Sequence, residues 1–352
     1  MIGRSGSTAS RALPSEEWEH PMTVEIRTKN IKPLRNAFEH LEKRFGNKTA
    51  TRYQEIAYDV QSEANFHYKP LWDPEHDLYD RRRTAIVLKD WYVLKDPRQF
   101  YYGSYTTMRA KQQDALDRQM EFVEKRDLVR GLPEAARKAI VELLVPLRHY
   151  EWGANTILCH VAAYGFGTAI TQAAIMGTAD RLGMAQHLSR IGLLVDGNSG
   201  DSLGEAKRCW MEDPAWQGLR EEVERLFVTR DWFEVLVAQC LVADSHLYPL
   251  LFQHYDTYFA AQYGPILSSV TDFLMRWYDE TTRWVDAVVK TAAVESAENK
   301  KLLSDWTRQW RDRFEPASAA LAAAALGDKA DAAMAAVRES LTTRLGKLGL
   351  ST

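Results

Sequence analysis

From Trp152 to Ala179 the sequence contains no Asp, Glu, Lys or Arg. An uncharged run of this length either crosses a bilayer or lies inside a helical protein. Asn155, His160 and Gln172 interrupt it, as do several glycines, and it lacks the Leu, Ile and Val density of a spanning helix. The run therefore predicts a central helix of a bundle, buried on all sides, whose small residues let neighbouring helices approach closely.

The chain beyond residue 100 has apolar residues at helical spacing and no persistent strand alternation. Pro133 and Pro214 are placed to open helices, Pro146 marks a break or kink before the uncharged run, and Pro249 should kink a helix. The fold class predicted is all-α, a ferritin-like bundle of long helices with an irregular N-terminal arm. Helices are expected from Tyr101 to Val129, from Pro133, over the uncharged run, from Arg181 to Val195, after Asp201, from Pro214, from Asp231 to about Tyr263, from Pro265 to about Val294, from Glu298 to Phe314, and from Ala317 to Leu348 with a break at Gly327-Asp328.

Four regions follow from composition. Residues 1–21 are polar, lack the apolar core of a secretory signal, and are expected to be a disordered extension or an artificial remnant. Residues 22–100 form an arm rich in aromatic residues and proline, which either wraps its own domain or, as we favour, lies on another subunit. Residues 101–314 are the helical bundle, and residues 315–352 are Ala-rich C-terminal helices or a tail.

Bundles of this type often hold two irons between carboxylates, which requires a Glu-x-x-His pair on each of two helices. The sequence has Glu three residues before His once, at Glu17 and His20, in the polar N-terminal region. At Glu151 the corresponding position is Ala154. The scaffold thus resembles that of an oxygenase while the metal site is expected to be absent, which predicts a partner subunit with no catalytic, cofactor-binding or metal-binding residues of its own.

Other polar pairs are interpreted as structural, because their members point to different helix faces or flank a proline in a loop. Asn155 and His160 need hydrogen-bond partners if they are buried, and could fill the space of a lost metal site. The pairs considered are Asp73 with His76, His149 with Glu151, Asn155 with His160, and Asp244 with His246.

The formal net charge is −3 and the pI is about 6.3, which gives no sign of nucleic-acid binding. The cluster Arg81-Arg82-Arg83 is too short to change this, and is read as a solvated loop or a contact with an acidic partner. Cys159, Cys209 and Cys240 have neither disulfide nor zinc spacing, so buried free thiols in a reducing cytoplasm are expected, with no membrane partner.

Short segments spread along the chain carry a family resemblance. They are Arg52–Glu55, Asn65–Tyr68, Pro70–Pro74, Thr84–Ile86, Asp96–Gly103, Arg181–Met184, Leu188–Leu194, Arg230–Glu234 and Arg283–Asp286. Together they closely resemble the β subunit of the hydroxylase component of bacterial multicomponent phenol hydroxylases, over about residues 22–310. Related β subunits of toluene, alkene and methane monooxygenases share fewer of these sequence segments.

The resemblance implies a soluble di-iron monooxygenase system in which only the α subunit binds the di-iron centre and hydroxylates the arene. It implies an α2β2γ2 hydroxylase, a reductase that carries FAD and a [2Fe–2S] cluster and uses NADH, and a small effector protein. The β subunit in this family resembles an α subunit without its metal site, which agrees with the missing Glu-x-x-His pairs.

The arm and this architecture suggest subunit-interface residues. These are Trp72, Arg81, Arg82, Arg83, Phe100, Tyr101 and Tyr102. Alternatives to a non-catalytic phenol hydroxylase β subunit stay open: the β subunit of a toluene or alkene monooxygenase, an independent metalloenzyme with unusual ligands, or an unrelated helical scaffold.

Overall fold

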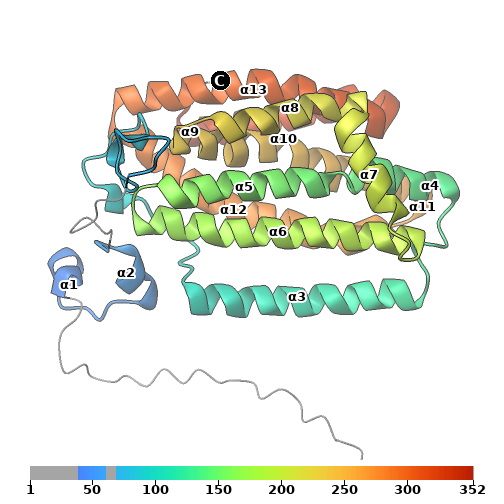
Figure 1. The fold of residues 1–352 in the computed structure, drawn as a ribbon, viewed down its shortest axis with the longest axis horizontal. Helices are drawn as coiled ribbons and strands as arrows, with labels where there is room; N and C mark the ends of the chain where they lie inside the picture. The colour runs from blue at the N-terminus through green and yellow to red at the C-terminus, as the bar shows by residue number, and fades with distance from the viewer. Residues whose placement is uncertain (1–38, 61–68, 352) are drawn as a thin grey trace, which may run out of the picture. The chain divides into compact units, whose positions relative to one another are not determined.

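A computed structural model describes residues 39–60 and 69–351, and every regular element in these ranges is a helix (Figure 1). The all-α, ferritin-like prediction is therefore confirmed. The expected extension at 1–21 lies outside the described residues, as do Phe66 and Tyr68 of the arm. Residues from His40 onward form one compact unit, so the described arm, the bundle and the C-terminal helices are treated together.

Beyond residue 100 the described chain folds into long helices joined by short turns. Their bounds are α3 (Tyr102–Lys125), α4 (Glu134–Ala139), η3 (Ile140–Leu144), α5 (Leu147–Tyr164), α6 (Thr168–Asp196), α7 (Asp201–Glu212), α8 (Pro214–Val228), α9 (Trp232–Leu236), η4 (Val237–Ala243), α10 (Asp244–Pro249), η5 (Leu250–Tyr255), α11 (Asp256–Tyr263), α12 (Ile266–Glu295), α13 (Ala297–Leu326), η6 (Gly327–Lys329) and α14 (Ala330–Leu348).

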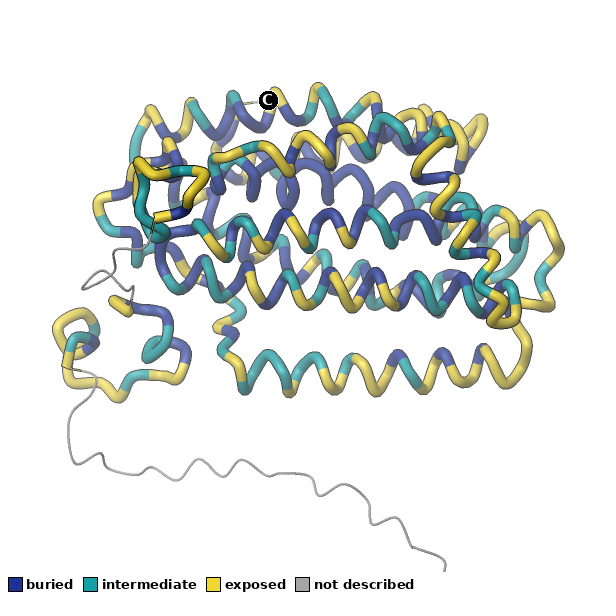
Figure 2. The backbone as a smooth tube through the Cα atoms, in the orientation of Figure 1, coloured by how far each residue is buried: buried dark blue, intermediate teal, exposed yellow. Residues whose placement is uncertain are grey.

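The uncharged run is not one central helix. It folds into α5 and the first part of α6, which lie side by side as an antiparallel hairpin (Figure 1). The turn between them needs Gly167, whose φ of 92° is unfavourable for other residues. Nor is the run buried on all sides, since Trp152 is 55% and Ile175 52% exposed. Exposed positions recur along α5 and α6 in Figure 2. Absence of charge alone did not reveal that one face of each helix looks outward.

From Trp232 to Tyr263 the chain is one continuous helical run, α9 to α11, as predicted. Pro249 lies inside it and is followed by a π-helical turn, η5, because proline has no N–H to donate to the preceding turn. By length and composition this run is the one in the described residues that could cross a membrane. Its most apolar window is 94% buried inside the protein, which is the pattern of a core helix.

The expected boundary at residue 314 falls within α13, which continues through Pro316 to Leu326. The Ala-rich segment therefore packs instead of forming a tail. The chain turns at Gly327, and α14 returns along α13 with Met334, Val337 and Leu341 buried. Small alanine side chains let these two helices pack closely.

The described part of the arm contains the short helices α1 (Glu39–Phe45) and α2 (Arg52–Ala57) and the 3₁₀ turns η1 (Arg81–Arg83) and η2 (Trp91–Val93). It packs on its own chain. The Tyr53 hydroxyl lies 2.7 Å from the amide nitrogen of Asp96 and accepts its hydrogen bond. Trp91 is 4% exposed and contacts the rings of Phe166 and Trp232. Tyr53 and Trp91 are thus buried in their own chain, and placement of the arm on another subunit stays a prediction for its exposed residues.

The three cysteines differ in their exposure to solvent. Cys209 and Cys240 are buried, as expected, while Cys159 is exposed on α5. The prediction of three buried thiols is therefore wrong at Cys159, because the outward face of α5 was taken to be core.

Candidate functional site

A charged group lies at the centre of the bundle. Arg181 of α6 is fully buried, and its guanidinium sits between two carboxylates from other helices. Its Nη1 donates a hydrogen bond of 2.9 Å to Oε2 of Glu151 on α5. Its Nη2 donates a short hydrogen bond to Oδ2 of Asp244 on α10. One cation thus joins two anions that are far apart in the sequence.

Two phenols complete this ionic centre, defined here as Glu151, Arg181, Asp244, Tyr150 and Tyr248. The Tyr150 hydroxyl donates to Oδ1 of Asp244 at 2.7 Å, and the Tyr248 hydroxyl donates to Oε1 of Glu151 at 2.8 Å. Each carboxylate therefore receives one bond from the arginine and one from a tyrosine. Hydrogen bonds to every charged oxygen are what makes such burial tolerable.

Neighbouring side chains enclose the centre. The ring of Trp277 on α12 lies 4.5 Å from Cζ of Arg181 and offers a cation–π contact. The side-chain nitrogen of Gln239 donates to the Tyr150 hydroxyl at 2.7 Å. Residues of α5, α6, α10, α12 and η4 thus meet at one point in the core.

Burial and charge oppose each other in this centre. Burial acts to lower the pKa of Arg181, but the carboxylates of Asp244 and Glu151 outweigh it and hold that pKa above its ordinary value. Burial raises the pKa of Glu151, although Arg181 partly offsets the effect. Burial also raises the pKa values of Tyr150 and Tyr248, so both phenols stay protonated as donors. A positively charged guanidinium therefore lies at the centre of the bundle.

These residues do not fit a carboxylate-bridged metal pair. The space between Glu151 and Asp244 holds the Arg181 side chain, and a cation next to a guanidinium is strongly disfavoured. The Nδ1 of His246 faces the Val242 carbonyl of its own helical run, 2.8 Å away. Within residues 39–60 and 69–351, no three His, Cys, Asp or Glu side chains are placed to share a metal ion.

Sequence reasoning named Glu151 and Asp244 but paired each with a histidine. The structure pairs them with each other through Arg181. His149 instead stacks on Trp210, with ring centroids 5.9 Å apart. The sequence signal for Arg181 was its helical spacing from the apolar residues of α6, because it lies on the same buried stripe as they do. That stripe is Ala174, Gly177, Arg181, Met184, Leu188, Ile191 and Val195.

Asn155 and His160 do not fill the bundle centre, so that suggestion is wrong. The Asn155 side chain donates to the Thr178 carbonyl at 2.7 Å and fastens α5 to α6. The ring of His160 bonds to the Arg230 carbonyl at 3.1 Å. The loop pair behaves as predicted, since Nδ1 of His76 lies 2.9 Å from Oδ1 of Asp73.

The basic cluster does not act as one surface. Arg83 is buried, bonds to Asp73 at 2.8 Å, and lies over the ring of Tyr164. Arg82 is exposed and pairs with Asp80, and the Arg81 guanidinium lies 4.8 Å above the Phe166 ring. Arg83 is therefore a structural residue of this chain, and the other two remain on its surface.

The aromatic residues predicted to lie at a subunit interface also differ in their exposure. Phe100 is 6% exposed and packs within its own core, so it offers no surface to a partner. Tyr101 is half-buried at the start of α3, whereas Tyr102 is 79% exposed. Trp72 is 52% exposed, and its ring makes an edge contact with Tyr164 at the end of α5. Trp72 and Tyr102 stay interface candidates.

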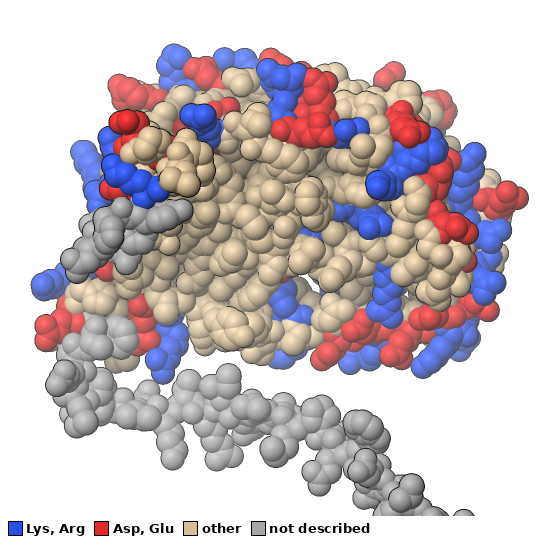
Figure 3. Space-filling model, viewed as in Figure 1, with Lys and Arg blue, Asp and Glu red and all other residues tan. Residues whose placement is uncertain are grey.

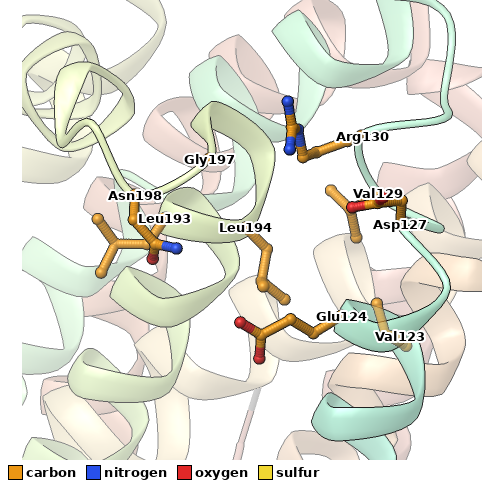
Figure 4. Close-up of a pocket in the computed structure, with 9 residues that line it drawn as sticks. All are labelled: Val123, Glu124, Asp127, Val129, Arg130, Leu193, Leu194, Gly197 and Asn198. Carbon is orange, nitrogen blue, oxygen red and sulfur yellow. The ribbon is translucent and has the colours of Figure 1, made fainter.

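A small cavity of about 120 Å³ lies between the end of α3 and the end of α6 (Figure 4). Glu124 and Arg130 lie at opposite sides of it and do not converge on a common point (Figure 4). Gly197 ends α6 in a left-handed conformation beside Arg130. The cavity has room for a few waters and no arrangement of catalytic groups.

Comparisons with known proteins agree with the fold. A family described as Methane/Phenol/Alkene Hydroxylase matches residues 72–296. The phenol 2-monooxygenase oxygenase component DmpL of Pseudomonas sp. (strain CF600) is 46% identical over 329 residues, which are 94% of this chain and 98% of that protein. The toluene-4-monooxygenase hydroxylase component subunit beta of Ectopseudomonas mendocina is 26% identical, over 70% of this chain and 76% of that subunit.

A solved structure of phenol hydroxylase from Pseudomonas sp. OX1 superposes with a TM-score of 0.87 at 42% identity, and covers 93% of this chain and 99% of that one. The family match over residues 72–296 includes α5, α6, η4, α10 and α12, the helices that build the ionic centre. The chain therefore belongs to the methane, phenol and alkene hydroxylase family, and its resemblance to a hydroxylase-component subunit of phenol hydroxylases is confirmed.

Proposed function

We propose that this chain is the non-catalytic β subunit of a multicomponent phenol hydroxylase, and that it supports the di-iron α subunit and assembly of the hydroxylase. The complex would hydroxylate phenol or related arenes with NADH and O2 as part of aromatic catabolism. The observation that carries the proposal is Arg181, which occupies the bundle centre between Glu151 and Asp244.

The chemistry of the ionic centre supports a structural role. A general acid or base has to reach its substrate and exchange a proton at working pH. Here the carboxylates are held by Arg181 and by two phenols, and Arg181, Glu151 and Asp244 are at most 1% exposed. The centre thus joins helices instead of presenting a reactive group.

The proposed partners are α and γ subunits in an α2β2γ2 hydroxylase, a small effector protein, and an NADH reductase with FAD and a [2Fe–2S] cluster. The di-iron centre would belong to α. Support comes from relatives whose names describe a component or a subunit of a larger system. A cytoplasmic location suits these partners and the free thiols.

Metal analysis and reconstitution test the proposal. The chain purified alone should contain far less than one iron and oxidise no phenol, whereas the complex with its larger subunit should contain iron and turn over. About one or two irons per isolated chain, held through gel filtration, would instead favour an independent metalloenzyme. Activity of the complex on toluene or alkenes but not on phenol would move the chain to a related branch.

A further inference from the structure

The outward face of the α5–α6 hairpin has no exposed charged residue from Trp152 to Gln186. Every exposed residue between Trp152 and Gln186, all of which are described, is uncharged. Trp152, Ile175 and Leu182 are 55%, 52% and 45% exposed. The set, here called the hairpin face, is Trp152, Thr156, Cys159, Ala163, Ile175, Ala179, Leu182, Gly183 and Gln186.

The core does not require this composition. A surface helix normally carries charged residues on its solvent side. Helix α3 does so, since Lys111, Asp114 and Arg118 are exposed along it. Contiguous apolar residues at the surface are typical of interaction sites. The contrast between two long helices of one bundle therefore indicates that the hairpin face is covered in the functional state.

The face continues beyond the hairpin. The ring of Phe227, at the end of α8, lies 6.3 Å from that of Trp152, and Val228 beside it is 78% exposed. At the other end of α5, Trp72 packs on Tyr164, and Leu71 is 99% exposed. Figure 3 shows a broad uncharged area in the region of α5 and α6, with charged residues gathered toward its rim.

A groove is built into this surface. It has a volume of about 430 Å³ and lies between the start of α5 and the middle of α6. Trp152 and Leu182 form its apolar walls, and Arg148 and His149 line one end. Two antiparallel helices with a groove between them provide the ridges against which a third helix packs.

We infer that the hairpin face binds a helix of the larger hydroxylase subunit, and that this helix presents an uncharged apolar stripe. The inference rests on the proposed function. Helix α5 is about 27 Å long, and two helices side by side are about 20 Å wide, so the face offers roughly 500 Å². With the Phe227 and Trp72 extensions it approaches the roughly 800 Å² per partner of a stable interface.

The absence of charged residues from the hairpin face favours a helix of the larger subunit over other occupants. A nucleic acid or an anionic membrane surface would need Lys and Arg on the face, and a polar peptide would leave Trp152 and Ile175 exposed. A rigid helical subunit with a matching uncharged surface buries them. A second copy of this chain is the competing occupant, and the experiment separates the two.

Cys159 is a native probe of the face, because it is the exposed one among the three cysteines, all of which are described. Maleimide should label Cys159 in the isolated chain and leave the buried Cys209 and Cys240 unlabelled. In the complex with the larger subunit of the same organism, the labelling rate should fall at least ~10-fold. A control variant, Ala115→Cys on exposed α3, should stay reactive in the complex.

A matched pair of variants tests the energetics. Trp152→Glu on α5 and Phe122→Glu on α3 change residues that are 55% and 54% exposed. Trp152→Glu should weaken binding of the larger subunit by ~30-fold or more, and Phe122→Glu by less than ~3-fold. Both should keep the helical circular dichroism of the unaltered chain.

The outcomes separate the two hypotheses. If the unaltered chain does not bind a larger subunit at all, the proposed function fails. If it binds while Cys159 stays fully reactive, or if the two Glu variants weaken binding equally, the hairpin face is not the docking site. Protection of Cys159 in the isolated chain at high concentration, with a dimer by sedimentation, would assign the face to a second copy and overturn the inference.

Discussion

The two faces of the α5–α6 hairpin reverse the usual distribution of charge. The inner face brings Glu151 and Arg181 into the ionic centre with Asp244, fully out of water. The outer face is exposed and uncharged, with Trp152 and Ile175 at its surface. Charge lies where a core is normally apolar, and apolar groups lie where a surface is normally charged.

The difference separates two kinds of contact. The inner face makes directional hydrogen bonds among fixed partners, which define which helices meet and in what register. The outer face offers shape and apolar area, which stabilise an association only when a partner covers them. Variants on the inner face should therefore change the stability of the chain, and variants on the outer face should change its assembly.

The largest effect is expected at Arg181. Arg181→Ala removes the one cation between Glu151 and Asp244 and leaves two buried carboxylates facing each other. Breaking a buried ion pair costs about 3–5 kcal/mol, measurable as a loss in the free energy of unfolding in urea. The control Arg118→Ala, exposed on α3, should stay within ~0.5 kcal/mol. Equal stability of the two variants would show that the ionic centre does not hold the bundle together.

A pH-dependent effect is expected at His187, also on the inner face of α6. Burial lowers its pKa to about 4, although the Val270 carbonyl 2.6 Å from Nε2 opposes this. Because the folded pKa is below the unfolded value of about 6.5, His187 contributes stability above pH 6.5 that is lost as pH falls toward 4. The loss at pH 5 is about 2 kcal/mol. His187→Gln should flatten the stability profile between pH 6.5 and 4, and an unchanged slope would count against this assignment.

Two glycines of the hairpin give a smaller, two-sided test. A Cβ at Gly153, which faces α8, would lie 2.6 Å from Cγ1 of Val223, whereas one at Gly183 would meet nothing within 4 Å. Gly153→Ala should destabilise the chain by about 1–2 kcal/mol through overpacking. Gly183→Ala should stabilise it by up to ~1 kcal/mol through helix propensity. Thermal unfolding measures both, and shifts of the same sign would remove the distinction between inner and outer face.

The smallest effect on the isolated chain is expected for Ile175→Lys. The side chain is 52% exposed on the outer face, so the free energy of unfolding should change by no more than ~0.5 kcal/mol. A loss above about 2 kcal/mol would mean that Ile175 is part of the core after all.

Sequence alone determined that the chain beyond residue 100 is helical and where several of the helices begin or end. Proline positions and apolar spacing are local properties, so α3, α8, α12 and the run from Trp232 to Tyr263 were predictable. The hydrogen bond between Asp73 and His76 was also local, since the two residues are three apart.

Tertiary structure decided the rest. Glu151, Arg181 and Asp244 are separated by 30 and 63 residues, and no periodicity states which helices meet. An uncharged segment is equally compatible with a buried helix and with an interface helix, because both are removed from water in the functional state. Only the packing of α5 and α6 showed that one face of this hairpin holds the charged centre while the other remains open to solvent. Spacing fixes the angle of a side chain around its helix, and the neighbouring helices decide which angle points inward.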